Sequence, residues 1–132
     1  MTCIHLIEDN IETCTLVQKV LLLAGYRMIT SHDGEHALHL LENRLIPLPN
    51  LIILDVALPG MTGYEVARRI KKNPILRQIP VVFFSSRNRA ELQEMVQEIG
   101  IEGIISKPFK VSEFLTKIEN KLVADKSDLI NC

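Results

Sequence analysis

The sequence lacks several features that would suit an extracellular, membrane-bound or nucleic-acid-binding protein. Cysteine is scarce, with three residues in 132, and none of them stands in a Cys-x-x-Cys pair. An odd number of scattered cysteines is a poor disulfide framework, so a reducing, cytoplasmic compartment fits best. Charge is nearly balanced, with 15 basic and 16 acidic residues. This balance gives no electrostatic reason to expect binding to nucleic acid or to an anionic membrane.

A long apolar run is also missing. The apolar run 51–54 stops at Asp55, and no segment approaches the roughly 20 apolar residues that a membrane span needs. Residues 1–5 do not combine a basic region with a long apolar stretch, so we expect no signal peptide there. Nearly half of the residues (47%) are hydrophobic, which is enough to build one packed core. We therefore expect one domain over residues 1–124, followed by a polar, frayed tail over residues 125–132.

Short apolar runs alternate with helical patterns along the chain. The expected strands are residues 3–7, 26–30, 51–54, 81–84 and 103–106. A helix is expected after each strand, and the last three helices cover residues 64–71, 89–99 and 111–123. The first helix should be capped by Asn10 and end at Gly25, and the second should follow the turn Asp33-Gly34. This alternation indicates an α/β fold in which helices cover both faces of a parallel sheet.

Polar side chains follow four of the five expected strands. They are Glu8 and Asp9 after the first strand, Asp55 after the third, Ser85 after the fourth and Lys107 after the fifth. Sites in open parallel sheets form beyond the carboxyl ends of the strands, so we expect these side chains to meet. Carboxylates gathered at one sheet edge repel one another unless a cation lies among them. Oxygen ligands that are open to solvent suit Mg²⁺.

The same set of residues suits phosphoryl transfer. A carboxylate such as Asp55 can attack phosphorus and form an aspartyl phosphate. The transferred group needs positive charge around its oxygens, which Mg²⁺ would supply from one side and Lys107 from the other. The hydroxyl of Ser85 offers a hydrogen bond to a phosphoryl oxygen.

Six segments, in order along nearly the whole chain, resemble those of response-regulator receiver domains, the family that includes the chemotaxis regulator. The segments are residues 6–10 (LIEDN), 32–38 (HDGEHAL), 51–55 (LIILD), 58–65 (LPGMTGYE), 80–85 (PVVFFS) and 107–109 (KPF). Each segment is weakly specific alone, but the ordered set is highly specific. The resemblance implies a doubly wound, three-layer α/β/α fold whose five parallel strands lie in the order 2-1-3-4-5.

The resemblance also implies a metal site and a phosphoacceptor. Glu8 and Asp9 match the acidic pair that holds Mg²⁺ in the family. Asp55 matches the phosphoacceptor and the third carboxylate ligand of the metal. Ala57 matches a position that gives the metal a backbone carbonyl.

Two further residues match positions that contact the phosphoryl group. Ser85 matches the hydroxyl residue that senses phosphorylation. Lys107 matches the family's lysine, and its bond to Pro108 should be cis, which only X–Pro bonds adopt readily. The phosphoryl donor would be a histidine kinase or a histidine phosphotransfer protein. A downstream protein, which the sequence does not identify, would bind the surface of the fourth helix, fifth strand and fifth helix. The chain would thus be a signalling switch and not a conventional enzyme.

Three positions affect how such a switch would work. Ile104 stands where the family usually has Tyr or Phe, whose ring changes rotamer when the hydroxyl residue moves. Because Ile104 cannot repeat that movement, we hypothesise a weaker switch or one propagated by the loop after the fourth strand. Ala57 and Arg87 hold positions that tune hydrolysis of the acyl phosphate. A small Ala57 leaves room for water, whereas Arg87 would screen the phosphoryl group or pair with it. These two effects oppose each other, so the phosphoryl lifetime stays open.

Three other functions fit the sequence less well. A phosphatase with an aspartyl nucleophile needs a second Asp two residues after the first, where Ala57 stands. A flavin carrier needs a hydroxyl- and glycine-rich loop after the first strand, where Glu8 and Asp9 would repel a phosphate. A degenerate receiver that acts as a constitutive protein-interaction module is disfavoured by the intact site, but Ile104 leaves it open.

The histidines suggest one further pattern. His32 to His36 match the H-x-x-E-H motif of a zinc protease class. That motif requires one continuous helix, and Gly34 stands at an expected turn inside it. We therefore expect His36 and His39 to be solvated, and His5 to be packed and hydrogen-bonded in the first strand.

Overall fold

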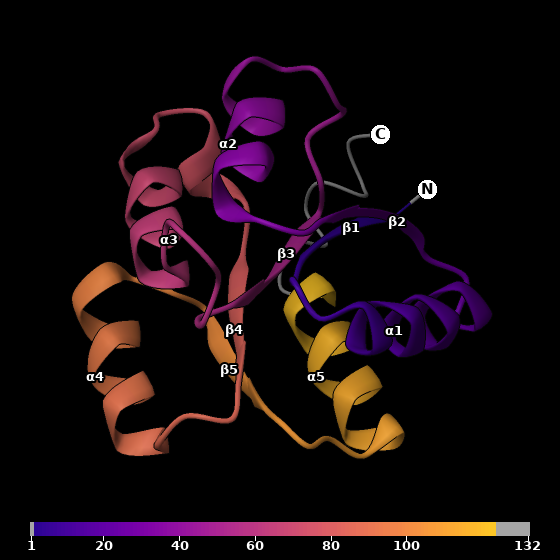
Figure 1. The fold of residues 1–132 in the computed structure, drawn as a ribbon. Coiled ribbons are helices and arrows are strands. Elements are labelled where there is room, and N and C mark those ends of the chain that lie inside the picture. Colours follow the sequence, from indigo (N-terminus) through magenta and orange to yellow (C-terminus); the bar gives the residue numbers. More distant parts are fainter. Residues whose placement is uncertain (1, 124–132) are drawn as a thin grey trace.

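Strands and helices alternate along the computed structural model, which describes residues 2–123 (Figure 1). The strands are β1 (Cys3–Ile7), β2 (Arg27–Ser31), β3 (Leu51–Asp55), β4 (Val81–Ser85) and β5 (Gly103–Ser106). The helices are α1 (Ile11–Leu23), α2 (Gly34–Glu42), α3 (Gly63–Lys72), α4 (Arg89–Ile99) and α5 (Val111–Val123), and a short 3-10 helix, η1 (Leu76–Gln78), precedes β4. The expected alternation of strands and helices is confirmed. The expected tail at residues 125–132 lies outside the described residues.

The strands form one parallel sheet in the order β2-β1-β3-β4-β5. This order confirms the predicted doubly wound topology. The register pairs Ile7 of β1 with Leu54 of β3, and Asp55 of β3 with Phe84 of β4. The carboxyl ends of these central strands therefore lie side by side, at the edge where sites form in open parallel sheets.

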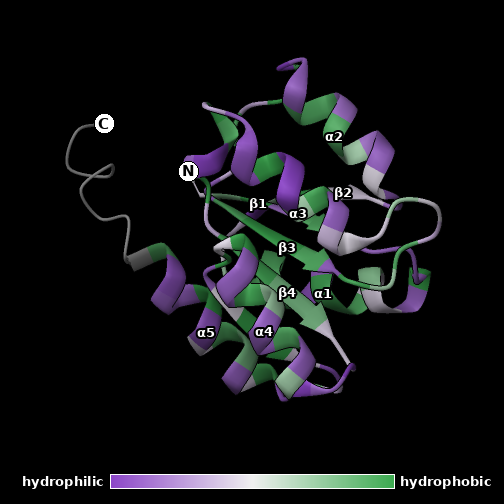
Figure 2. Cartoon of the chain, turned by 90° about the vertical axis from the view of Figure 1, so that its left-hand side faces the viewer, coloured by the Kyte–Doolittle hydropathy of each residue, from purple (hydrophilic) through white to green (hydrophobic). Residues whose placement is uncertain are grey.

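Helices cover both faces of the sheet and make three layers (Figure 1). Apolar side chains of α2, α3 and α4 pack on one face, and those of α1 and α5 pack on the other. Figure 2 shows apolar strands enclosed by helices that carry polar residues on their outer surfaces. Residues 51–54 of β3 are fully buried, which is typical of a central parallel strand.

Side-chain caps fix the starts of the helices. The Asn10 side chain accepts a hydrogen bond from the Thr13 backbone N–H at 2.8 Å, which confirms the predicted cap of α1. Such a cap satisfies one of the N–H groups that the first helical turn leaves without a partner. At the other end of α1, Gly25 adopts φ 92°, a conformation that glycine reaches without steric cost.

Some element boundaries differ from the prediction by one residue. Strand β2 begins at Arg27 and not at Tyr26, because the Tyr26 N–H is bonded to the Leu21 carbonyl at the end of α1. The 3-10 helix η1 was not predicted. It follows Asn73, whose side-chain oxygen accepts N–H groups two and three residues ahead. Among the described residues, no helix has the length and apolar character to cross a membrane.

Candidate phosphoryl-transfer site

The predicted site residues lie at one edge of the sheet. Glu8 and Asp9 follow β1, Asp55 is the last residue of β3, Ser85 is the last residue of β4, and Lys107 follows β5. Strand β2 ends at Ser31, whose carbonyl accepts the Glu8 backbone N–H at 2.9 Å. The parallel register thus gathers residues that are up to 99 positions apart in the sequence.

Three carboxylates form an acidic cluster at this edge. Glu8, Asp9 and Asp55 each place an oxygen within 4.8 Å of the others, and no histidine belongs to a comparable group among residues 2–123. Glu8 is 1% exposed and Asp55 is 5% exposed, whereas Asp9 is exposed. Burial raises the pKa of Glu8 above its ordinary value, although the hydrogen bond from Lys107 opposes this. This set of hard oxygen donors, open to solvent through Asp9, fits a hard divalent cation such as Mg²⁺.

Lys107 supplies positive charge beside this cluster. Its Nζ lies 2.5 Å from Oε1 of Glu8 and 3.5 Å from Oδ2 of Asp55. The Lys107–Pro108 bond is cis, as the resemblance implied. The ammonium also lies 4.6 Å from the centroid of the Phe84 ring, a cation–π contact. Lys107 is therefore held by contacts to three strands or strand ends of the sheet.

Asp55 is held by its own loop and by the start of α3. Its Oδ1 accepts the Ala57 backbone N–H at 3.0 Å. Gly63, the first residue of α3, donates its N–H to the Val56 carbonyl at 2.8 Å. A Cβ on Gly63 would overlap the Asp55 carbonyl oxygen and lie 2.6 Å from the Val56 Cα. The sequence analysis did not identify Gly63 as a site residue, because this contact depends on how α3 packs against the end of β3.

Ser85 is buried at the end of β4. Its Oγ accepts the Arg87 backbone N–H at 3.0 Å, and its residue is 2% exposed, whereas Ser86 is exposed. The Arg87 side chain points to α4 and α3. It pairs with Glu91 at 3.5 Å and lies 5.8 Å from the centroid of the Tyr64 ring. The guanidinium of Arg87 is thus engaged by these two residues.

Two residues that the sequence analysis did not assign to the site hold the backbone of Glu8. The Cys14 thiol donates to the Glu8 carbonyl at 3.2 Å, and Nδ1 of His32 lies 3.1 Å from the same oxygen. Because a carbonyl can only accept, this contact requires the His32 tautomer with its proton on Nδ1. Burial raises the pKa of Cys14 to about 11, so the thiol stays protonated as a donor. In the sequence, the signals available for these contacts were a histidine at the end of an expected strand and a cysteine on the first expected helix.

The other histidines behave as predicted. His32 precedes α2, so His32 and His36 do not share a helix as the zinc motif requires. His36 and His39 are exposed. His5 is fully buried, and its Nε2 lies 2.8 Å from Oγ of Ser31. Burial lowers the pKa of His5 to about 4, so its imidazole is neutral near pH 7.

The chain matches the family model described as response regulator receiver domain over residues 4–119. It is 36% identical to two-component response regulator ORR6 of Oryza sativa subsp. japonica, over 81% of this chain and 63% of that protein. It is 31% identical to polar-differentiation response regulator DivK of Brucella anthropi, over 90% of this chain and 94% of that protein. The chain spans 50 to 63% of the length of the first three curated relatives that it matches.

Solved structures of response regulators and receiver domains also superimpose on this chain. The chemotaxis response regulator CheY4 of Vibrio cholerae superimposes with a TM-score of 0.81 at 25% identity, over 92% of this chain and 98% of that chain. The receiver domain of sensor histidine kinase PA1611 from Pseudomonas aeruginosa superimposes with a TM-score of 0.80 at 25% identity, over 92% and 97% of the two chains. That structure is described as having a magnesium ion coordinated in its active site cleft.

Proposed function

The chain belongs to the family of response-regulator receiver domains, and we propose that it is a phosphoacceptor switch of a two-component phosphorelay. In this proposal, Asp55 takes a phosphoryl group from a histidine kinase or a histidine phosphotransfer protein. Phosphorylation of Asp55 alters the surface of α4, β5 and α5, which a downstream protein binds. The observation that carries the proposal is the buried Asp55 carboxylate, which lies beside two further carboxylates and 3.5 Å from the Lys107 ammonium.

Mg²⁺ is the metal that we propose for the acidic cluster. Glu8, Asp9 and Asp55 would hold it, together with the backbone carbonyl of Ala57. When bound, the ion would supply positive charge that offsets the charge of the phosphoryl oxygens. The clustering of three carboxylates, each with an oxygen within 4.8 Å of the others, supports this assignment.

The residues of the chain itself account for the transfer step. A bond forms between an Asp55 carboxylate oxygen and phosphorus, while the bond from phosphorus to the donor nitrogen breaks. The Ala57 N–H orients the carboxylate through Oδ1, and Oδ2 faces Lys107. The positive charge of Lys107 would then offset the charge of about −1.5 to −2 that a phosphoryl group adds near pH 7.

Ser85 would link the phosphoryl group to α4. The present hydrogen bond from the Arg87 N–H to Ser85 Oγ would be lost or weakened when the hydroxyl turns to a phosphoryl oxygen. Asn88, three residues after Ser85, caps α4 by accepting the N–H groups of Ala90 and Glu91. A change at Ser85 would therefore reach the first turn of α4 through a short loop. This route does not require an aromatic ring at Ile104.

A receiver domain of a response regulator is a signalling protein and not a conventional enzyme, so the transfer proposed here is a self-modification. The phosphoryl donor, the downstream protein and a cytoplasmic location stay predictions. So does the extent of the domain over residues 1–124.

The test is intact-protein mass spectrometry after treatment with acetyl phosphate, with and without Mg²⁺. We expect one phosphoryl addition that depends on Mg²⁺, is absent from Asp55→Asn, and persists in the matched control Asp33→Asn at the cap of α2. No addition to the folded protein, under conditions where Mg²⁺ binding is measured and hydrolysis is followed by rapid quenching, would overturn the proposal. That result would favour the constitutive interaction module.

A further inference from the structure

The carbonyl oxygen of Glu8 lies where β1 has ended and the chain turns toward α1. The Glu8 N–H donates to the Ser31 carbonyl at 2.9 Å, so the bonding between β1 and β2 continues to this residue. No backbone N–H among residues 2–123 donates to the Glu8 carbonyl. Two side chains donate to it instead, the Cys14 thiol at 3.2 Å and His32 through Nδ1 at 3.1 Å. Without them, a buried carbonyl would lack a hydrogen bond, which is costly.

The two donors approach this oxygen from different elements. Cys14 is 3% exposed and lies on α1, on the face that packs against the sheet. His32 directly follows Ser31, which is the β2 partner of Ile7, so His32 stands beside Glu8. The Cys14 Sγ and the His32 Nδ1 lie 3.8 Å apart. Because a carbonyl oxygen has two lone pairs, it can accept both donors at once.

This bonding fixes the backbone that carries the Glu8 carboxylate. Glu8 is 1% exposed, its Oε2 accepts the Asn10 N–H at 3.1 Å, and its Oε1 faces Lys107. The carboxylate lies with those of Asp9 and Asp55 in the acidic cluster. Since the backbone is already held, only the side-chain torsions of Glu8 remain to be ordered when a cation binds. Such preorganisation lowers the entropic cost of binding.

We propose that Cys14 and His32 are positioning residues that raise the affinity of the acidic cluster for Mg²⁺ by holding the Glu8 backbone. The inference rests on the proposed function, because it concerns the metal assigned there. The cluster consists of Glu8, Asp9 and Asp55, so Cys14 and His32 act on the metal through Glu8. Removal of the partners that orient metal ligands commonly costs about 10- to 100-fold in metal affinity.

The size of the effect should depend on whether a donor is kept. Cys14→Ala or His32→Ala alone should weaken Mg²⁺ binding by roughly two- to tenfold, the equivalent of one net hydrogen bond. The double alanine variant should weaken it by about tenfold or more. Cys14→Ser keeps a donor as an O–H. His32→Asn places an amide N–H as many bonds from Cα as Nδ1 is, so both conservative variants should bind Mg²⁺ nearly as the wild type does.

The test is an NMR titration of the ¹⁵N-labelled full chain with MgCl₂ at pH 8 and constant ionic strength, followed through the amide shifts of Asp9 and Ala57. Cys3→Ala, at the start of β1, and His39→Ala, at an exposed position of α2, are matched controls that should keep the wild-type affinity. Urea unfolding of each variant checks that the fold is kept. Long-range ¹H–¹⁵N spectra without Mg²⁺ should show the His32 proton on Nδ1.

Phosphoryl uptake from acetyl phosphate gives a second readout. Because Cys14 and His32 act on metal affinity, the double alanine variant should take up the group slowly at low Mg²⁺. Its rate should approach that of the wild type at saturating Mg²⁺. A rate that stays slow at saturating Mg²⁺ would place the defect in the transfer step and overturn the proposal.

Three other results would overturn the positioning role. These are equal Mg²⁺ affinity in the wild type and the double alanine variant, equal losses in the conservative and alanine variants, or a neutral His32 protonated on Nε2 alone. A wild type that binds no Mg²⁺ would reject the metal assignment and this inference together. A wild type that binds Mg²⁺ but takes up no phosphoryl group would reject the switch, and the measured affinities would still decide the role of Cys14 and His32.

Discussion

The buried histidine of β1 gives a quantitative prediction about acid stability. His5 is fully buried, and Ser31 Oγ lies 2.8 Å from its Nε2. Its Nδ1 has no hydrogen-bond partner among the described residues. A charged imidazolium has two N–H donors to satisfy, and this site offers one oxygen. Burial therefore favours the neutral ring and lowers the pKa of His5 from 6.5 to about 4.

The direction of the effect follows from proton binding. Between pH 6.5 and about 4, the His5 side chain binds a proton in the unfolded chain but not in the folded chain. Acidification across this range therefore favours unfolding, and the stability from neutral His5 is fully present only above pH 6.5. A difference of one pKa unit corresponds to about 1.4 kcal/mol. The contribution of His5 to the free energy of unfolding should thus fall by about 3 kcal/mol on acidification from pH 7 to pH 4.

The assay is urea unfolding followed by circular dichroism at pH 7, 6, 5 and 4, for wild type and His5→Gln. The variant should be less stable at pH 7 but should lose about 3 kcal/mol less on acidification. Glu8, whose burial raises its pKa, acts in the opposite sense because its stabilising effect is present at low pH and is lost as the pH rises. Its contribution is common to both proteins and cancels in the comparison. His39→Gln, at an exposed position, is the matched control for the loss of an imidazole. Equal pH dependence of wild type and His5→Gln would refute the reasoning.

Two further predictions concern the site. Gly63→Ala should lower the free energy of unfolding by roughly 1–3 kcal/mol, because its Cβ would overlap the Asp55 carbonyl; urea unfolding measures the loss, and mass spectrometry should show slower phosphoryl uptake. Unchanged uptake would mean that the end of β3 adjusts without moving Asp55. Lys107→Met should slow phosphoryl uptake from acetyl phosphate by about 10²-fold or more, the loss that follows removal of one donor that stabilises developing charge in an enzyme. An uptake rate within twofold of the wild type would remove Lys107 from the transfer step.

Much of the fold follows from local signals in the sequence. The apolar runs are short, and each ends where a polar residue begins the next loop, so the strands are visible directly. The caps Asn10 and Gly25 mark the ends of α1 and take the expected roles in the structure. Strand order is different, because no local pattern contains it, and it came from the resemblance to a family. The pairing of β1 with β3 confirms it.

The site, like the fold, has residues that the sequence predicts and residues that it does not. The strand-end rule was sufficient to predict that Glu8, Asp9, Asp55 and Lys107 lie together, and the structure brings them together. Residues that act on the backbone of the site were not predicted. Gly63 contacts the end of β3 only because α3 packs there, and a glycine has no side chain whose chemistry would reveal this.

Cys14 and His32 show why such contacts escape sequence reasoning. Both bond to the same Glu8 carbonyl, Cys14 from α1 and His32 from the residue after β2, so these contacts exist only once β1 pairs with β2 and α1 packs on the sheet. Cysteine and histidine side chains in general are associated with redox, metal or catalytic chemistry. In the structure they serve as two hydrogen-bond donors that fix the backbone of an acidic residue. The type of a residue therefore predicts its chemistry less well when its partner is a backbone group.

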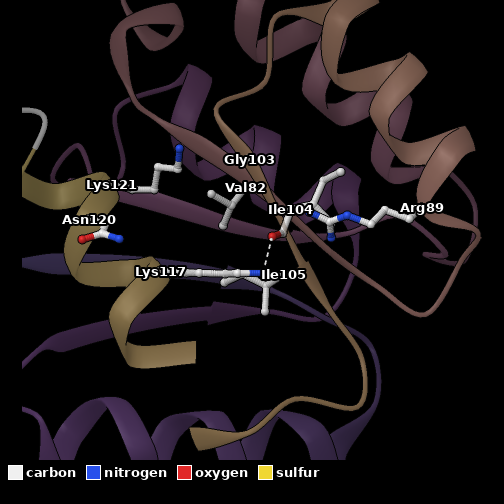
Figure 3. A pocket seen from close by; sticks show the side chains of 8 residues that line it. All are labelled: Val82, Arg89, Gly103, Ile104, Ile105, Lys117, Asn120 and Lys121. Carbon is white, nitrogen blue, oxygen red and sulfur yellow. Dashed lines mark hydrogen bonds between the residues drawn. The ribbon is translucent and has the colours of Figure 1, made fainter. Parts of the chain in front are cut away.

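The position of Ile104 connects these observations to the proposed switch. Ile104 is 9% exposed, so its side chain belongs to the core, while its carbonyl accepts a hydrogen bond from Lys117 Nζ at 3.3 Å (Figure 3). A β-branched side chain packed in this way is restricted at χ1 and has no ring that could turn when the hydroxyl moves. The polar contacts that join the end of β4 to α4 and β5 run instead through Ser85, the loop before α4, Arg89 and Ser106. If the switch operates in this chain, the change should therefore travel along the loop and the first turn of α4, and the side chain of Ile104 should keep its rotamer.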